Sequence, residues 1–258
     1  MKHIARSTLI IAVFFGLEKA LGFVRNILIS RTFSENPELL DAFNAANNIP
    51  DLLFALISGG ALAMALIPVL SEYFETRTRS DAWDLFSRIA NLVFLSTLGL
   101  SVLIAIFADQ LVASRIGIAP GFGPEQQGLV ADLMRLNLIA TMLFSLAGLA
   151  IAGLQANQHF ILPALAPSMY DLGALVGILI LVPETSIQLG PVTLPAFGLG
   201  IHGLVYGTIL GAAMFLGVQI PGLIRFGYRW TPKINLRHPG VRQVLVVLGP
   251  RVLTVFFI

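Results

Sequence analysis

Residues 85–108 read LFSRIANLVFLSTLGLSVLIAIFA, a nearly unbroken apolar run long enough to cross a bilayer as one α-helix, which takes about 20 residues. On either side of this run lie five more of the same kind, and a seventh begins near residue 243. The five lie at 8–30, 50–72, 129–153, 160–182 and 200–222. None has the period of two expected of a β-barrel strand. The sequence therefore predicts an all-α polytopic membrane protein.

The composition indicates the same class. The chain has 258 residues, of which 56% are hydrophobic and 12% charged, whereas roughly 25% are charged in an ordinary soluble domain. Its net charge is only +2, and the basic residues lie between apolar runs, which argues against a nucleic-acid partner. There is no cysteine, and the four histidines are scattered singly. We expect no catalytic residue, no metal site, no cofactor and no enzymatic activity.

The distribution of Lys and Arg predicts the orientation. If the N-terminus is cytoplasmic, the inside segments carry ten basic residues, whereas the outside loops carry only Arg31 and Arg115. This bias is the positive-inside pattern, and it predicts an even number of crossings before the basic stretch 225–242. The ten inside residues are Lys2, Arg6, Arg77, Arg79, Arg88, Arg225, Arg229, Lys233, Arg237 and Arg242.

The runs predict three parts. Residues 1–224 form a six-helix membrane lobe, 225–242 a basic cytoplasmic linker, and 243–258 the start of a seventh transmembrane helix. The last part holds about a third to a half of the residues needed to cross a bilayer. We therefore expect that the chain is truncated and is the first half of a longer protein.

The first span carries Glu18, Lys19, Arg25 and Asn26. A charge at mid-membrane costs about 2.5–3.5 kcal/mol on insertion scales, so such groups tend to face a protein interior or a water-filled cavity. At 100° per residue, Glu18, Gly22 and Arg25 fall within about 60° of one another, so one face of this helix is predicted to be wet. The surplus positive charge favours an anionic ligand. The alternative is a Glu18–Arg25 ion pair that only holds helices together.

Polar residues also precede the second span. Asp41, Asn44 and Asn48 recur at i, i+3 and i+7, and on a helix they form one polar face. We interpret Asn48 as a cavity candidate and Asp41 as a candidate ligand-binding residue. The equally weighted alternative is a solvated juxtamembrane helix with capping near Pro50 and Asp51.

Asp171 lies near the middle of the fifth span, shortly after Pro163 and Pro167. Prolines free backbone carbonyls that neighbouring groups or water must satisfy. We interpret Asp171 as a cavity residue; a proton or cation site and a buried hydrogen-bond acceptor stay open. Asp132 and Arg135, at the start of the fourth span, are predicted to form a structural i, i+3 pair.

Glycines mark close contacts and a bend. Residues 198–203 match G-x-G-x-x-G, but no βαβ unit surrounds them, so a dinucleotide site is rejected. Spacing of four residues instead predicts close helix approach in the fifth and sixth spans. Gly59 and Gly60 are predicted to form a hinge in the second span. The closely spaced glycines are Gly173 and Gly177, and Gly203, Gly207 and Gly211.

Three motifs, taken in order and spacing, resemble the MurJ (MviN) family of lipid II flippases. They are LGFVRN at 21–26, DAFNAANNIP at 41–50 and ALIPVLSEY at 65–73. The resemblance implies the multidrug, oligosaccharidyl-lipid and polysaccharide exporter superfamily, with two six-helix lobes around a central cavity. It implies that this chain is the six-helix N-terminal transporter lobe, in the bacterial cytoplasmic (inner) membrane, and that the second lobe of the same chain is missing.

The resemblance also implies a function and its residues. Such a flippase moves the undecaprenyl-pyrophosphate-linked peptidoglycan precursor, lipid II, from the cytoplasmic to the periplasmic leaflet by alternating access. Its partners would be lipid II and membrane lipids, with coupling to membrane potential or a monovalent cation. The pyrophosphate-attracting basic positions map onto Lys19 and Arg25, and the acidic position before the second helix onto Asp41.

Two positions depart from the family pattern. Phe54 stands where many members carry Arg, and Glu18 stands where a small polar residue is common, so the cavity is expected to be less positive than usual. The alternatives are an exporter of another polyprenyl-linked glycan, a cation-coupled drug antiporter and a non-transporting lipid-binding membrane protein.

Overall fold

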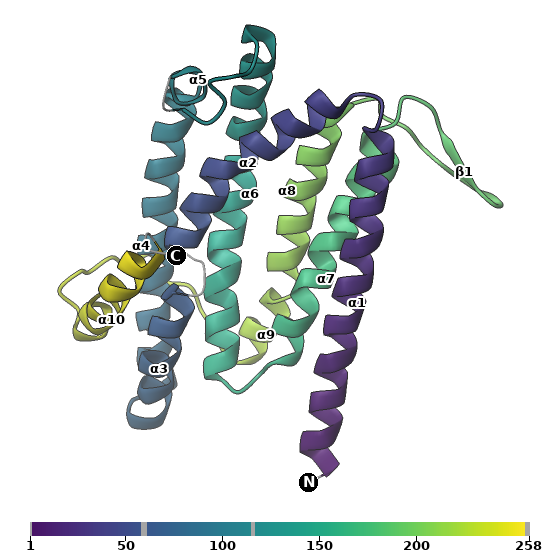
Figure 1. Cartoon of the computed structure of the whole chain (residues 1–258). Coiled ribbons are helices and arrows are strands. Elements are labelled where there is room, and N and C mark those ends of the chain that lie inside the picture. Colours follow the sequence, from purple (N-terminus) through teal and green to yellow (C-terminus); the bar gives the residue numbers. More distant parts are fainter. Residues whose placement is uncertain (1, 58–60, 115–116, 256–258) are drawn as a thin grey trace.

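The structure is a computed structural model that describes residues 2–57, 61–114 and 117–255 (Figure 1). These residues form a helical bundle with one short β-hairpin. The helices are α1 (Lys2–Thr32), α2 (Pro37–Ile57), α3 (Ala61–Thr76), α4 (Arg79–Ile106), α5 (Ala108–Ala113), α6 (Pro124–Ala156), α7 (Ile161–Val176), α8 (Ile201–Gly217), α9 (Ile220–Arg225) and α10 (Pro239–Val255). A π-helical turn, η1 (Gly177–Leu181), continues α7, and the strands are β1 (Ile187–Leu189) and β2 (Val192–Leu194).

The fold confirms the predicted membrane class. Within the described residues, four helical stretches are long and apolar enough to cross a membrane, and they match the predicted third to sixth spans. They cover 79–106, 124–156, 161–181 and 201–225. The first predicted span lies within α1.

The second predicted span, 50–72, falls on two of the described helices. Its residues are divided between α2, which starts at Pro37, and α3, which starts at Ala61. Proline fits the first turn of a helix, which suits Pro37 to the start of α2. The hinge candidates Gly59 and Gly60 lie outside the described residues.

The long helix α6 is the centre of the bundle. It packs against α2, α3, α4, α5 and α8, and it carries side chains of two separate hydrophobic clusters. Its C-terminal half joins α3, α4 and α10 in one cluster, which includes Leu149 and Leu154 of α6 and Phe86 of α4. Its N-terminal half joins α2, α5 and α8 through Val130 and Met134. Polar residues in the middle of α6 therefore lie between two apolar cores.

Helices α7 and α8 touch through their backbones, as the glycine spacing predicts. A Cβ atom added at Gly207 would lie 2.7 Å from the Gly177 Cα, which is closer than real Cβ atoms approach. Gly173 faces Gly211 in the same way, and Gly203 faces the backbone at Val182. The predicted close approach of the fifth and sixth spans is confirmed.

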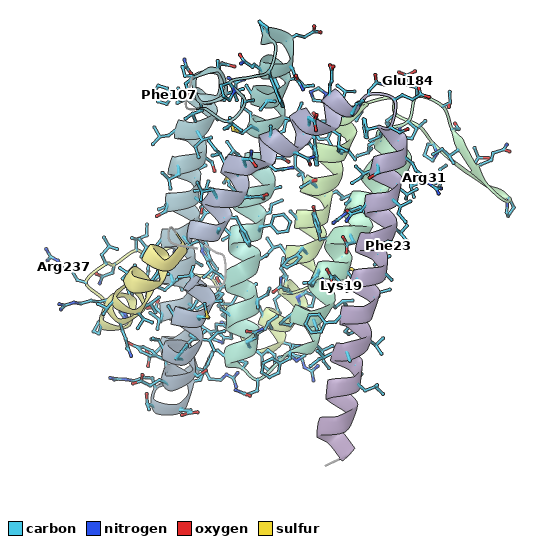
Figure 2. The ribbon with its side chains drawn as sticks, in the orientation of Figure 1. Lys19, Phe23, Arg31, Phe107, Glu184 and Arg237 are labelled. Carbon is cyan, nitrogen blue, oxygen red and sulfur yellow. The ribbon has the colours of Figure 1, made fainter. Side chains whose placement is uncertain are left out.

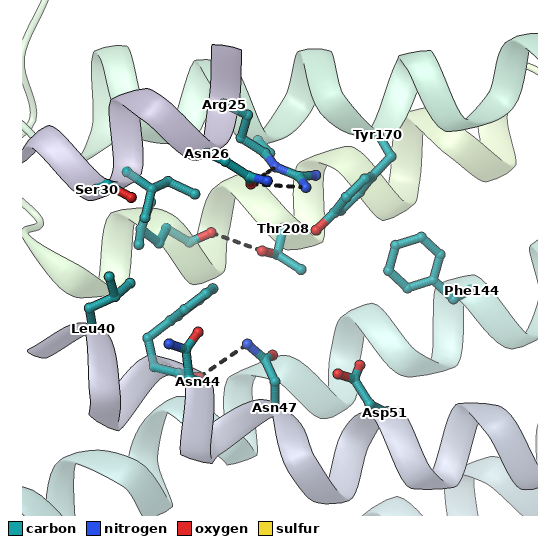
Figure 3. A pocket seen from close by; sticks show the side chains of 14 residues that line it. Arg25, Asn26, Ser30, Leu40, Asn44, Asn47, Asp51, Phe144, Tyr170 and Thr208 are labelled. Carbon is teal, nitrogen blue, oxygen red and sulfur yellow. Dashed lines mark hydrogen bonds between the residues drawn. The ribbon is translucent and has the colours of Figure 1, made fainter. Parts of the chain in front are cut away.

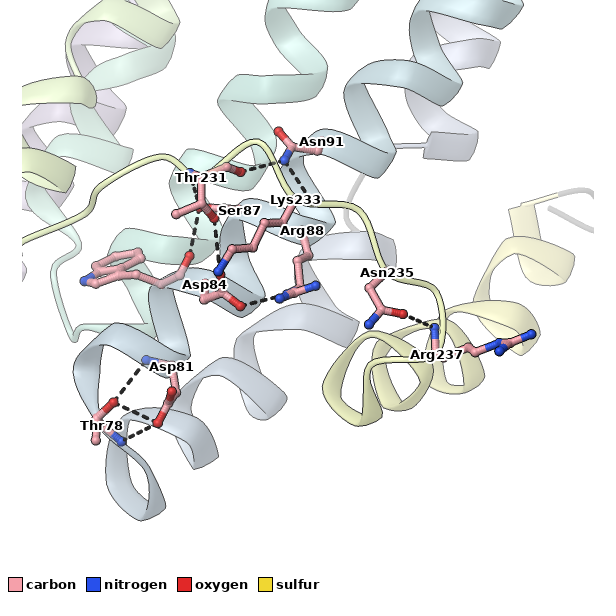
Figure 4. A network of polar contacts seen from close by, with 11 residues as sticks. Thr78, Asp81, Asp84, Ser87, Arg88, Asn91, Thr231, Lys233, Asn235 and Arg237 are labelled. Carbon is pink, nitrogen blue, oxygen red and sulfur yellow. Dashed lines mark hydrogen bonds and ion pairs between the residues drawn. The ribbon is translucent and has the colours of Figure 1, made fainter.

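The stretch between α9 and α10 is bound to α4 by a polar network (Figure 4). Asp84 pairs with Arg88 at 2.7 Å and with Lys233 at 3.2 Å. Asn91 donates to the carbonyls of Thr231 and Lys233, at 2.8 and 2.9 Å. These contacts lead the chain across α4 and deliver α10 to α3 and α4.

The β-hairpin is an element that the apolar runs did not predict. Its strands pair antiparallel in the connection between η1 and α8. Gly190, with φ +62°, lies between the strands, where a left-handed backbone suits glycine. Figure 1 shows the hairpin projecting from the end of the bundle opposite the N-terminus.

The glycine contact yields a stability prediction. Gly207→Ala should destabilise the bundle by about 1–3 kcal/mol, because the added methyl group forces α7 and α8 apart. The matched control is Gly99→Ala on α4, where an added Cβ meets open space; it should be neutral or stabilise by up to about 1 kcal/mol. Thermal unfolding of the purified chain in detergent measures both. Equal melting temperatures for the two variants would contradict the contact.

The start of α10 yields a pH prediction. Burial, and then the nearby Arg88 guanidinium, lower the pKa of His238, whose ring lies 6.4 Å from that of Tyr73. Because the undocked segment binds a proton more readily, docking should weaken as the pH falls below about 6.5. The hydrogen-exchange protection factors of the α10 amides, which are corrected for the intrinsic pH dependence of exchange, should fall over that range, and His238→Gln should remove the fall. An unchanged profile in the variant would show that another group is responsible.

Candidate functional site

Two adjoining cavities lie among α1, α2, α6, α7 and α8, with volumes of about 320 Å³ and 460 Å³. We call them the first and second cavity; Figure 3 shows the first. The first extends along α1 toward Ser30 and along α2 toward Leu40, and the second extends toward Glu18 and Asn137. Both are lined by Arg25, Asn47, Asp51, Phe144, Tyr170 and Thr208.

Arg25 is held on three sides. Its Nη1 lies 2.5 Å from Oδ1 of Asp171, and its Nε and Nη2 donate to the Asn26 amide oxygen at 3.4 and 3.3 Å. Its guanidinium lies over the Tyr170 ring, 5.3 Å from the centroid. The Asp171 side chain is only 4% exposed, whereas that of Arg25 is 21% exposed. The guanidinium thus reaches the cavity from a buried anchor.

Asp171, and not Glu18, is the partner of Arg25. The alternative interpretation, a Glu18–Arg25 lock, is therefore wrong, because Glu18 pairs instead with its neighbour Lys19, at 3.2 Å. Gly22 lies one turn before Arg25 on α1, and a Cβ there would lie 3.6 Å from the Asp171 carboxylate. The Asp171 carboxylate therefore lies against α1 at Gly22, beside Arg25.

The charge balance of the cavities is acidic. Within the described part of the chain, Arg25 is the only basic residue that lines them, whereas Glu18, Asp51 and Asp171 supply three carboxylates. The Lys19 side chain is 81% exposed and does not line either cavity (Figure 2). Phe54, where the resembled family often carries Arg, packs its ring 5.9 Å from that of Phe144.

The candidate residues fall into two groups. Arg25, Asn26 and Glu18 gather at the cavities, as the wet face of the first span predicts, and Asp171 of the fifth span lines the second cavity, as predicted. Three others do not line them: Lys19, Asp41 and Asn48. Asp41 lies in a separate groove with Glu38, Glu125 and Asp132. The binding roles assigned to all these residues stay predictions.

Several lining residues were not singled out from the sequence. Asn44, Asn47 and Asp51 recur at i, i+3 and i+7, so they share a helix face that lies next to the predicted face of Asp41, Asn44 and Asn48. Capping near Pro50 and Asp51 is wrong, because α2 continues through both to Ile57. No sequence pattern marks Tyr170, Phe144 or Thr208 as a cavity residue, because a single aromatic residue or threonine is common in an apolar span.

The buried ion pair yields a stability prediction. Arg25→Ala should cost about 3 kcal/mol of folding stability, because it leaves the buried Asp171 without its cation. The double variant with Asp171→Ala should regain part of that loss. The control, Asp132→Ala, removes a 65% exposed partner of Arg135 and should cost about 0–1 kcal/mol. Chemical unfolding in detergent gives the three values, and strictly additive losses at positions 25 and 171 would contradict the coupling.

Comparison with known proteins identifies a family that matches this chain. The family described as "Lipid II flippase MurJ" matches residues 29–257. The chain is 28% identical over 239 residues to a "Probable lipid II flippase MurJ" of Buchnera aphidicola subsp. Acyrthosiphon pisum, covering 92% of the chain and 44% of that protein. It is 26% identical over 254 residues to the "Lipid II flippase MurJ" of Burkholderia cenocepacia, covering 96% and 46%. The chain thus spans about half the length of the curated relatives it matches.

Two solved structures share the fold. One is "Lipid II flippase MurJ, inward closed conformation", with a TM-score of 0.73, 20% identity, and coverage of 95% of this chain and 47% of that one. The other is a MOP superfamily transporter from Pyrococcus furiosus, with a TM-score of 0.72 and 16% identity, covering 95% and 51%. The binding pocket of the Pyrococcus transporter is described as having reverse polarity, which suggests a different function for that protein.

Proposed function

This chain belongs to the MurJ lipid II flippase family, and we propose on that basis that it acts as one lobe of a flippase that moves lipid II from the cytoplasmic to the periplasmic leaflet. The family consists of transporters and not of enzymes. The observation that carries the proposal is Arg25, a cation projecting into a cavity inside a multi-pass membrane bundle. An intramembrane cation of this kind is functional by default.

The cavity lining suits the headgroup of a lipid-linked glycan. A guanidinium binds pyrophosphate oxygens through paired hydrogen bonds. The amides of Asn26, Asn44 and Asn47 line the same cavity and can bond sugar hydroxyls. Phe144 and Tyr170 add aromatic surface beside Arg25. We propose that Lys19, which is exposed, contacts the pyrophosphate from the rim. We further propose that Glu18, in the second cavity, and Asp41, in the separate groove, accept hydrogen bonds from sugar hydroxyls.

Binding of a pyrophosphate to Arg25 would displace the Asp171 carboxylate. To reach Arg25, a pyrophosphate has to replace the Asp171 carboxylate, so one anionic partner substitutes for another. The net gain is smaller than for a free guanidinium, because the displaced carboxylate stays buried without a cation. A transporter must release its substrate on the far side, and a moderate gain at Arg25 favours release.

We propose that the N-terminus and the basic linker face the cytoplasm of a bacterial inner membrane. Figure 1 shows the start of α1 and the junction of α3 with α4 at the same end of the bundle. Arg77 and Arg79 lie at that junction. Basic residues near span ends on one side support a cytoplasmic assignment.

The proposal is tested in bacteria depleted of their own flippase. The chain, joined to the C-terminal half of the Burkholderia relative, should restore growth. Arg25→Ala and Lys19→Ala should each abolish rescue, because the pyrophosphate loses a cation, whereas Arg237→Ala on the exposed linker should not. Purified Arg25→Ala should also bind lipid II at least about tenfold more weakly. Full rescue by both site variants would contradict the proposal.

The acidic balance supports a second candidate, a cation-coupled exporter of organic cations. Three carboxylates against one guanidinium favour a cationic solute over an anionic one. Binding of tetraphenylphosphonium to the purified chain, lost in Asp51→Asn and unaffected by lipid II, would favour this candidate over the flippase.

A further inference from the structure

An unpaired acceptor lies at the wall between α2 and α6. Asn137, on α6, is only 2% exposed and lines the second cavity. Its side-chain Nδ2 donates to Oδ1 of Asn47 at 2.7 Å, but its own Oδ1 is buried without a donor among the described residues. Leaving a buried amide oxygen unpaired costs about 1–3 kcal/mol, so this atom calls for a ligand.

The amide orientations follow from the hydrogen bonds. Asn47 Nδ2 donates to the Phe43 carbonyl at 3.1 Å, which turns Asn47 Oδ1 toward Asn137. Asn137 must then offer its Nδ2 to Asn47, and a flip would bring two oxygens together. The chain of hydrogen bonds from Asn137 through Asn47 to the Phe43 carbonyl therefore leaves the Asn137 Oδ1 atom unpaired. This oxygen needs either a cation or a hydrogen-bond donor.

Further oxygens line the same wall. Asp51 lies one turn after Asn47 on α2, and Thr141 lies one turn after Asn137 on α6; all four residues line the second cavity. The Thr141 hydroxyl donates to the Asn137 backbone carbonyl at 3.2 Å, so its lone pairs are left as acceptors. Pro50 has no N–H, so the Ala46 carbonyl also lacks its usual partner four residues later.

Asp51 supplies a negative charge without a cation. Arg25, the one basic side chain at the cavities in the described residues, is already bonded to Asp171. One carboxylate among neutral amide and hydroxyl oxygens balances a single positive charge. Oxygen donors of this kind suit hard cations.

We propose that Asp51, Asn137, Asn47 and Thr141 form a binding site for one monovalent cation, Na⁺, between α2 and α6. The unpaired Asn137 Oδ1 atom coordinates the ion, and the positive charge of the ion balances the Asp51 carboxylate. It also ties α2 to the central helix α6, so its binding favours the arrangement in which the two helices are in contact. The site stands without any assumption about the transported molecule; only its coupling to transport rests on the proposed function.

The test measures Na⁺ alone, without lipid. Binding of ²²Na⁺ to the purified chain in detergent, with choline maintaining ionic strength, should be saturable and should outcompete K⁺. Asp51→Asn and Asn137→Ala should each weaken it at least about tenfold, because each removes a ligand. Thr141→Val, which keeps the side-chain shape, should weaken it less and guards against a folding defect in Asn137→Ala.

The matched control is Glu125→Gln, which removes an exposed carboxylate from the same helix as Asn137 and should bind Na⁺ like the wild type. Full Na⁺ binding in a folded Asp51→Asn variant would overturn the proposal, as would equal binding of K⁺ and Na⁺. Displacement of Na⁺ by tetraphenylphosphonium but not by excess K⁺ would assign the pocket to organic cations instead. Lipid II binding is measured separately, so a failed flippase assay leaves the Na⁺ result interpretable.

Discussion

The backbone contact between α7 and α8 is the constraint on which the cavity depends. Gly177 and Gly207 face each other where any side chain would separate the helices. Tyr170 and Asp171 lie on α7 and Thr208 lies on α8, so the separation of the two helices sets the shape of one cavity wall. Without that spacing, the carboxylate that anchors Arg25 and the ring beneath its guanidinium would both move. The glycines of α8 and of the α7–η1 helix thus fix the positions of Asp171 and Arg25.

The anchored Arg25 explains how a cation can lie inside a membrane bundle. Burying one charge alone is expensive, but a hydrogen-bonded partner and an aromatic face lower that cost. The same arrangement leaves the cavity acidic overall, because the pair cancels and two further carboxylates remain. A pyrophosphate carries more charge than Arg25 can balance, so the proposed flippase needs other cations, for which exposed Lys19 is a source.

The two proposed sites face each other across one cavity. Arg25 and Asp171 belong to the α1 and α7 wall, whereas Asp51 and Asn137 belong to the α2 and α6 wall. A Na⁺ ion at Asp51 would make the cavity less negative and so strengthen the binding of an anion at Arg25. By linkage the anion would strengthen Na⁺ binding by the same factor. Electrostatics alone could therefore couple ion and substrate.

Residue order alone was enough to predict the membrane class, four of the spans, the close packing of glycine-rich helices and the wet face that carries Arg25. Each depends on spacing along one helix, which the order of residues specifies directly. Only the tertiary structure shows that Arg25 pairs with Asp171 and not with Glu18, and that Asn137 donates a hydrogen bond to Asn47. These pairs join residues 146 and 90 positions apart, and the packing of helices selects among many possible polar partners. Helix spacing predicts which residues share a face, but not which face lies opposite.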